Sequence, residues 1–244
     1  MAPLPADAAA RCWVLIPCAG SGQRAGEGGP KQYRPIAGRP MVRHTVEAFR
    51  GAADRLAGVW VVIAPDDEDF LTVFPDFNGK GEYLLAGGGA TRAATVLAGL
   101  RAMRASGVPP TDWVLVHDAA RCLITPAQIG ALIDACQGDA VGGLLAQPLA
   151  DTLKAAEGGR VTATLPRGGK WLAQTPQMFR LGVLADALER AGDAVTDEAS
   201  AIEALGLAPR LVAGSAQNFK VTWPEDFALA EAVLAARAHA DMNT

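Results

Sequence analysis

Short apolar runs alternate along the chain with longer segments in which apolar residues recur every three or four positions. The short runs are apolar at successive positions and end in Gly, Pro or Asp, which is typical of strands buried on both faces. These runs are 13–18, 59–65, 82–87, 112–118 and 141–148. The segments between them have helical spacing, which predicts helices over 41–49, 90–105 and 125–137.

This alternation of strands and helices predicts an α/β fold with a doubly wound, mostly parallel, Rossmann-like sheet. In such sheets the ligand binds beyond the carboxyl ends of the strands. We therefore expect the functional site to involve the strand-to-helix loops after residues 16, 85 and 116.

One segment interrupts the alternation. Residues 150–175 contain an alternating apolar and polar run, the turn sequence EGGR and a second such run, VTATLP. This pattern predicts a β-hairpin arm, at about 150–172, that leaves a single domain covering 1–244. We expect 1–11 to be a loose tail, and 222–240 to form a helix that begins with the capping-box spacing of Thr222 and Glu225.

Composition excludes several classes of partner. The chain has 244 residues, a formal charge of −4 and 6% aromatic residues, so it lacks the basic and aromatic surface of a nucleic-acid or anionic-membrane binder. No segment has the roughly 18 to 20 apolar residues of a membrane span, and the first residues do not resemble a signal peptide. Four cysteines without a CxxC pair suit neither a zinc site nor a disulfide framework, which favours reduced thiols and a cytoplasmic location.

The glycine-rich stretch after the first strand is the strongest chemical signal. Residues 20–25 fit the dinucleotide pattern G-x-G-x-x-G/A, but AGEGGP at 25–30 puts three glycines and a proline where that pattern needs a helix. A nicotinamide-dependent oxidoreductase is therefore disfavoured. A loop with bare backbone, Arg24 and Lys31 better suits a triphosphate, whose charge those cations would stabilise. A solvated surface loop and a non-catalytic nucleotide-binding module remain the alternatives.

Six motifs occur in a fixed order. They are PCAGSGQRAGEGGPKQY (17–33), VLVHDAAR (114–121), DTLK (151–154), AQTPQMF (173–179), TDEAS (196–200) and NFKVTWPEDFALAE (218–231). Together they resemble the 2-C-methyl-D-erythritol 4-phosphate cytidylyltransferases, nucleotidyltransferases of the non-mevalonate isoprenoid pathway, from about Val14 to Leu234. A cytidylyltransferase for another polyol phosphate, such as ribitol 5-phosphate, is the alternative, because it shares the PKQ loop.

The resemblance implies transfer of CMP from CTP to 2-C-methyl-D-erythritol 4-phosphate, with Mg²⁺ and release of pyrophosphate. By motif match, the expected catalytic residues are Arg24, Lys31, Arg167 and Lys220. The expected nucleotide-binding residues are Cys18, Ala19, Gly20, Ser21, Gly22, Gly88, Gly89 and Thr95. The expected polyol-phosphate ligands are Arg121, Thr152, Arg167, Thr175, Thr196 and Lys220. Because the arm carries two of these residues, the resemblance also implies a homodimer with arm exchange.

Three further residues follow from the same resemblance. Asp118 ends a buried strand beside the phosphate loop, so we expect a Mg²⁺ ligand, although an Asp here also suits a helix N-cap. His117 is expected to be a packed, hydrogen-bonded histidine and not a general base, since an ionised phosphate needs no strong base to attack. Ala90 stands where the family often has Asp, which puts base selectivity in doubt.

Overall fold

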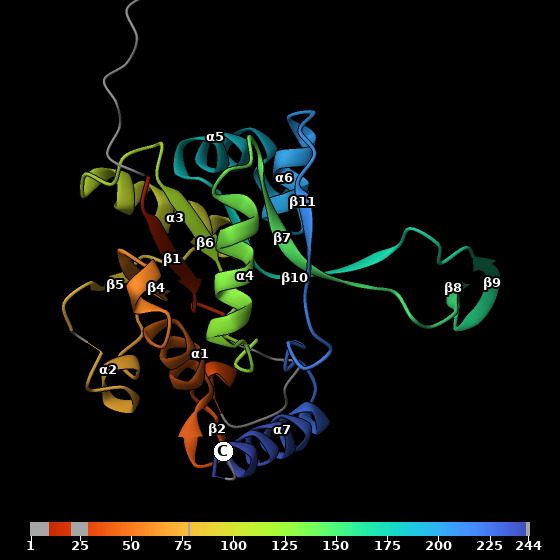
Figure 1. Ribbon diagram of the computed structural model, residues 1–244, viewed down its shortest axis with the longest axis horizontal. Helices are drawn as coiled ribbons and strands as arrows, with labels where there is room; N and C mark the ends of the chain where they lie inside the picture. The colour runs from red at the N-terminus through yellow and green to blue at the C-terminus, as the bar shows by residue number, and fades with distance from the viewer. Residues whose placement is uncertain (1–9, 21–28, 78, 243–244) are drawn as a thin grey trace, which may run out of the picture.

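The computed structural model describes residues 10–20, 29–77 and 79–242, and its centre is a seven-stranded sheet (Figure 1). Its order is β11-β7-β10-β6-β1-β4-β5. The strands are β1 (Cys12–Pro17), β4 (Gly58–Ile63), β5 (Glu82–Ala86), β6 (Trp113–Val116), β7 (Gly142–Pro148), β10 (Trp171–Arg180) and β11 (Arg210–Ala213). β10 is antiparallel to both neighbours, and every other neighbouring pair is parallel. The predicted doubly wound, mostly parallel sheet is confirmed.

Helices cover both faces of the sheet. They are α1 (Met41–Arg50), α2 (Phe70–Val73), α3 (Arg92–Ala105), α4 (Pro126–Cys136), α5 (Leu181–Ala191), α6 (Glu198–Ala204) and α7 (Pro224–Met242), with 3-10 turns η2 (Lys31–Tyr33), η3 (Ala53–Arg55) and η4 (Gly192–Ala194). Strand β1 explains the two layers, because its side chains alternate between faces. Val14 and Ile16 pack in the cluster that holds α1 and α4, while Leu15 packs with α3, α5 and α6.

The five strands and three helices predicted from periodicity are present, with ends that differ by one or two residues. Strands β10 and β11 are not predicted by the periodicity, and residues 171–172, the end of the predicted arm, belong to β10. There Trp171 pairs with Pro148 and Phe179 with Gly142, so the chain returns from the arm directly into the sheet. The periodicity of one segment cannot reveal this, because an antiparallel return strand is defined by its neighbours.

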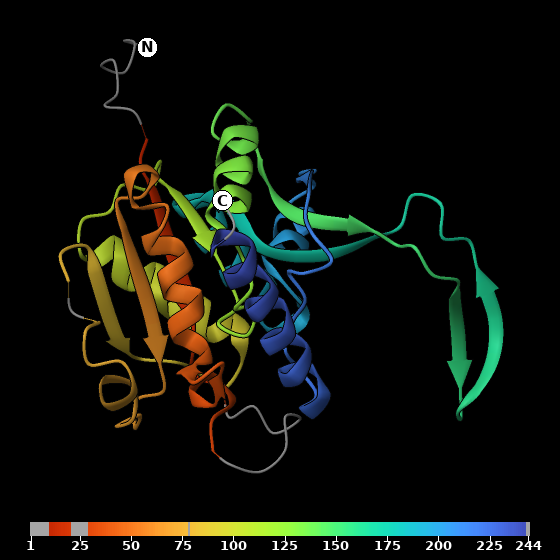
Figure 2. The same cartoon turned by 60° about the horizontal axis from the view of Figure 1, so that its bottom comes forward.

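The arm is the hairpin of β8 (Leu153–Glu157) and β9 (Arg160–Leu165). It stands away from the sheet on the extension of β7 and β10, as Figures 1 and 2 show. All six residues of β9 are exposed. The projecting β-arm of the predicted fold is therefore present, and its role in dimerisation remains a prediction.

Helix α7 packs beside the short pair β2 (Pro35–Ile36) and β3 (Arg39–Pro40). Its predicted capping box is wrong: the carboxylate of Asp226 accepts the N–H groups of Thr222 and Trp223, at 2.7 and 2.8 Å. The hydroxyl of Thr222 instead donates to the carbonyl of Lys220 at 3.0 Å. The start of α7 thereby fixes the segment that carries Lys220. No helix in the described part of the chain is long and apolar enough to cross a membrane.

Candidate active site

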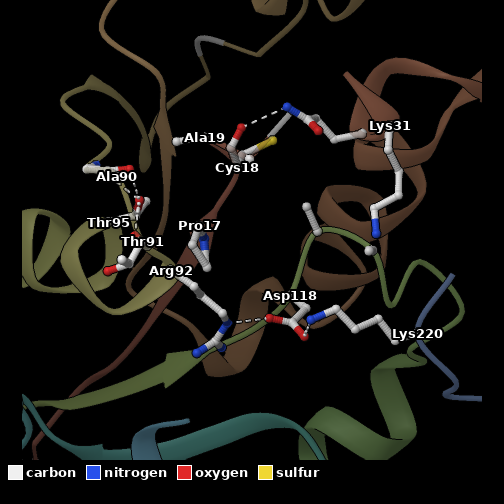
Figure 3. Close-up of a pocket in the computed structure, with 15 residues that line it drawn as sticks. Pro17, Cys18, Ala19, Lys31, Ala90, Thr91, Arg92, Thr95, Asp118 and Lys220 are labelled. Atoms are coloured by element: carbon white, nitrogen blue, oxygen red, sulfur yellow. Dashed lines mark hydrogen bonds and ion pairs between the residues drawn. The ribbon is translucent and has the colours of Figure 1, made fainter. Parts of the chain in front are cut away.

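A cavity of about 470 Å³ lies at the carboxyl ends of the strands, where β1 and β6 are neighbours in the sheet (Figure 3). The chain runs outward from β1 to β4 and β5 and then returns to β6 on the other side of β1, so the loops diverge here. Its lining includes Cys18, Ala19, Gly20, Lys31, Gly89, Ala90, Thr91, Arg92, Thr95, Asp118 and Lys220. In Figure 3, Lys31 and Lys220 lie across the cavity from Ala90, Thr91 and Thr95, with Asp118 below.

The loop after β1 is held by backbone bonds. The N–H of Cys18 donates to the carbonyl of Val62 at 2.7 Å, and its own carbonyl accepts from the Nε2 atom of Gln32 at 3.0 Å. A Cβ on Gly88 would stand 2.2 Å from that of Ala19, so Gly88 is required by this close packing. The thiol of Cys18 is buried, and burial raises its pKa far above the ordinary value, so it stays protonated.

The loop after β5 is shaped by two threonines. Thr91 caps α3 by accepting from the N–H of Ala94 at 3.1 Å. The buried Thr95 hydroxyl accepts from the N–H of Gly89 at 3.1 Å and lies 3.0 Å from the carbonyl of Thr91. A Cβ on Gly89 would meet that of Ala94 at 2.6 Å. Gly89 and Thr95 thus fix the loop shape, and their contact with a nucleotide stays a prediction.

Asp118 is the centre of an ion cluster at the bottom of the cavity. Its Oδ1 accepts from the Nε of Arg92 at 2.7 Å, its Oδ2 lies 2.9 Å from the Nζ of Lys220, and the Nε of Arg121 is 3.7 Å away. Burial alone would raise the pKa of this carboxyl, but Arg92 and Lys220 lower it well below its usual range. The carboxylate is therefore ionised, and the helix N-cap alternative is wrong because no helix begins here.

Arg92 is not among the residues expected from the sequence, although it lies between Gly89 and Thr95, which are. Its guanidinium binds Glu198 with two bonds, Nη1 to Oε1 at 2.6 Å and Nη2 to Oε2 at 3.0 Å, in addition to Asp118. Burial raises the pKa of Glu198 and Arg92 opposes that shift. Glu198 lies in the TDEAS motif, but its pairing with a residue 106 positions earlier has no sequence signal.

His117 and Thr175 form a buried hydrogen-bond chain behind Asp118. The N–H of Asp118 donates to the Thr175 hydroxyl at 3.1 Å. The ring of His117 lies 3.0 Å through Nδ1 from that hydroxyl and 3.1 Å through Nε2 from the carbonyl of Arg121. Because a carbonyl only accepts, Nε2 carries the proton and the Thr175 hydroxyl donates to Nδ1. Burial lowers the pKa of His117 to about 4, and the predicted packed, hydrogen-bonded histidine is confirmed.

Two basic residues among the predicted site residues bond to the segment before α7. Lys31 donates from Nζ to the carbonyl of Val221 at 2.8 Å, and Arg121 donates from Nη1 to that of Asn218 at 2.8 Å. Burial lowers the pKa of Arg121. The amide of the buried Asn218 donates to the carbonyl of Thr175 at 2.8 Å, which ties this segment to β10. Asn218 was missed as a positioning group, although the NFK motif contains it.

The remaining predicted residues that the structure describes do not line this cavity. Thr152 and Arg167 are exposed on or beside the arm, where Arg167 donates to the carbonyl of Ala150. Thr175 is buried, and the exposed Thr196 borders a smaller neighbouring cavity of about 100 Å³ that Arg92 also lines. Three predicted residues, Ser21, Gly22 and Arg24, lie outside the described residues.

The fold and the ion cluster at the strand ends define an α/β nucleotidyltransferase. A model of the family described as IspD, 2-C-methyl-D-erythritol 4-phosphate cytidylyltransferase, matches residues 12–236, and the chain belongs to this family. The predicted family resemblance is thus confirmed.

Relatives and solved structures agree with this assignment. The bifunctional enzyme IspD/IspF of Albidiferax ferrireducens is 61% identical over 96% of this chain, which spans 56% of that relative. The 2-C-methyl-D-erythritol 4-phosphate cytidylyltransferase of Cupriavidus pinatubonensis is 53% identical over 92% of this chain and 94% of its own length. A crystal structure of 4-diphosphocytidyl-2C-methyl-D-erythritol synthase aligns with a TM-score of 0.83 and 38% identity over 93% of this chain and all of the other. The crystal structure of the Thermus thermophilus cytidylyltransferase aligns with a TM-score of 0.74 and 34% identity, over 91% of this chain and 98% of the other.

Proposed function

We propose that this protein transfers CMP from CTP to 2-C-methyl-D-erythritol 4-phosphate, giving 4-diphosphocytidyl-2-C-methyl-D-erythritol and pyrophosphate. One observation carries the proposal: a single cavity joins the loop after β1, Lys31, and the chain of ion pairs Arg92–Asp118–Lys220. Family membership supports the choice of both substrates.

In this reaction a phosphate oxygen of the polyol phosphate attacks the α-phosphorus of CTP. The new P–O bond forms as the bond to the β-phosphate oxygen breaks, and pyrophosphate leaves with that electron pair. Lys31 lines the cavity beside the loop after β1, where a triphosphate would lie, so its charge can stabilise the transition state. Lys220 lies on the Asp118 side and would orient the attacking phosphate. No general base is required, in keeping with the neutral, buried His117.

Asp118 would hold a Mg²⁺ ion together with phosphate oxygens. It is the one carboxylate among the described residues that line the cavity, and it is ionised. Mg²⁺ is commonly bound by one or two carboxylates plus substrate phosphates, and each carboxylate oxygen keeps a second lone pair besides its bond to Arg92 or Lys220. When bound, the ion would neutralise charge on the triphosphate.

The arm residues fit a second chain better than their own. Thr152 and Arg167 are exposed residues of the arm, and the arm projects away from the central sheet (Figure 2). We therefore propose a homodimer in which the arm of one protomer brings both residues to the polyol phosphate at the other site, where Arg121, Thr175, Thr196 and Lys220 would complete the binding. For location we propose the cytoplasm, since all four cysteines are free and buried.

Pyrophosphate release by the purified protein tests this function. The assay contains Mg²⁺ and CTP and compares 2-C-methyl-D-erythritol 4-phosphate with ribitol 5-phosphate, and omission of Mg²⁺ tests the cofactor. We expect release with the first substrate alone and loss of release without the metal. Release with ribitol 5-phosphate alone would assign a different substrate, and silence with both in folded protein would refute the proposal.

A further inference from the structure

The guanidinium of Arg92 joins three segments that are distant in sequence. Arg92 is the first residue of α3, Asp118 follows β6, and Glu198 is the first residue of α6. The Nε bond to Asp118 is 2.7 Å, and the two bonds to Glu198 are 2.6 and 3.0 Å. All three side-chain nitrogens are therefore engaged by carboxylates.

Burial makes this bridge, formed by Arg92 with Asp118 and Glu198, hard to replace with other side chains. The side chains of Glu198 and Asp118 are 1% and 9% exposed, and a buried carboxylate is costly unless it is paired. A planar guanidinium presents its N–H groups in a fixed fork and can serve two carboxylates at once. A lysine at this position would offer one ammonium group and could not keep the same three distances.

The bridge sets the position of groups at both cavities. At the larger cavity, Thr91 and Gly89 belong to the loop that α3 continues, and the Thr95 hydroxyl fixes that loop. At the smaller neighbouring cavity, the amino end of α6 carries Thr196 and Asp197. That end has one further tether, because the Nε2 of Gln177 donates to Asp197 at 2.8 Å and its Oε1 accepts from the N–H of Ala199 at 2.7 Å.

We infer that Arg92 is a positioning residue of the cytidylyl transfer, which fixes the Asp118 carboxylate and, through Glu198, aligns the amino end of α6 with the loop after β5. The inference rests on the proposed function. Glu198 has the same positioning role but acts through Arg92, since Glu198 is not among the described residues that line the larger cavity.

The test compares the variants Arg92→Lys, Glu198→Gln and their combination with the wild type. The measurements are kcat, the KM of each substrate, CTP affinity by calorimetry and the melting temperature. A misplaced reacting group costs up to about a hundredfold in rate, so we expect kcat to fall about tenfold to a hundredfold in Arg92→Lys. CTP affinity should stay close to that of the wild type. Because both changes break one network, the double variant should lose less than the product of the single losses.

Arg101→Lys is the matched control. Arg101 lies on the same helix α3 and pairs with Glu189, with Nη2 to Oε1 at 2.9 Å, but its side chain is 62% exposed. This control should keep full activity, as should Glu189→Gln. Both variants retain the helix and remove or weaken an Arg–Glu pair that lies outside the cavity.

The outcomes separate the two claims. An unchanged kcat in Arg92→Lys, or strictly multiplicative losses in the double variant, would refute the positioning role while leaving the function intact. A loss of CTP affinity that accounts for the whole loss of kcat/KM would make Arg92 a nucleotide ligand instead. If Arg92→Lys does not melt cooperatively, the kinetics of Glu198→Gln alone test the positioning role, because glutamine has the same shape as glutamate. An inactive wild type would overturn the proposed function and this inference with it.

Discussion

The cavity and the arm carry the same kinds of charged residue in opposite surroundings. At the cavity, Asp118 is buried between Arg92 and Lys220, and its position is defined by bonds to three segments of the chain. On the arm, all residues of β9 are exposed, and Arg167 bonds to the carbonyl of Ala150 on the same extension. One chain is thus enough to organise the cavity. In the proposed homodimer, the arm instead acts at the site of a second chain.

The physical reason lies in the packing beneath each region. The cavity stands on two hydrophobic clusters that include the side chains of β1 and β6 on both faces of the sheet. None of residues 149–170, all of which are described, belongs to a hydrophobic cluster. A hairpin of two strands without a core is marginally stable in water, so the arm depends on the strands that it extends or on a partner.

The largest expected effect is at the cavity. Lys31→Ala should lower kcat by about a hundredfold to a thousandfold, because it removes a charge that stabilises the transition state, while CTP still binds. Turnover and CTP calorimetry measure both parts. Near-normal turnover would remove Lys31 from the transition state and weaken the contrast with the arm.

Arg167→Ala tests the arm. Hydrogen bonds to charged groups contribute about 1.5–3 kcal/mol, so the KM of the polyol phosphate should rise about tenfold to a hundredfold, while that of CTP stays unchanged. Steady-state kinetics with each substrate varied in turn measure this change. Unaltered kcat and KM would contradict the role of Arg167.

Mixing the Lys31→Ala and Arg167→Ala proteins shows whether the arm works on its own chain or on a partner. In a symmetric dimer with arm exchange, each mixed dimer has one intact site, so random mixing should restore roughly a quarter of wild-type activity. No recovery in verified mixed dimers would mean that each chain completes its own site.

The pH dependence of stability reports on the polar chain behind Asp118. Burial lowers the pKa of His117 from 6.5 to about 4, and burial lowers that of His44 as well. The unfolded chain then binds protons that the folded chain does not, so stability is complete above about pH 6.5 and falls as the pH drops towards 4. Urea unfolding at pH 7 and pH 5 should differ by about 2 kcal/mol. His117→Gln should reduce that difference, and an unchanged slope would show that His117 does not contribute.

The smallest expected effect is again on the arm. Val161 is 63% exposed, so Val161→Ala should change the free energy of unfolding by less than about 0.5 kcal/mol at protein concentrations that keep the chain monomeric. The matched control Val114→Ala, at a fully buried position of β6, should cost about 2 kcal/mol or more. Equal costs at the two positions would show that the arm is packed within one chain.

The sequence by itself determined the elements whose signal is local. Runs such as that of β1 predict strands because successive apolar side chains need burial on both faces, and the alternation with helices defines a doubly wound sheet and its strand-end loops. The motifs also placed Lys31, Asp118 and Lys220 among the expected site residues, and all three line the cavity.

Tertiary structure alone decided the contacts between distant segments. The strand β10 is recognisable by its pairing with β6 and β7. The role of Arg92 is recognisable by its bonds to two carboxylates that lie 26 and 106 residues away in the sequence. Folding also showed that the hydroxyls of Thr95 and Thr175 bond within the protein. These facts depend on which groups become neighbours in the buried interior, where an unpaired charge or polar group is costly, and no periodicity along the chain encodes that.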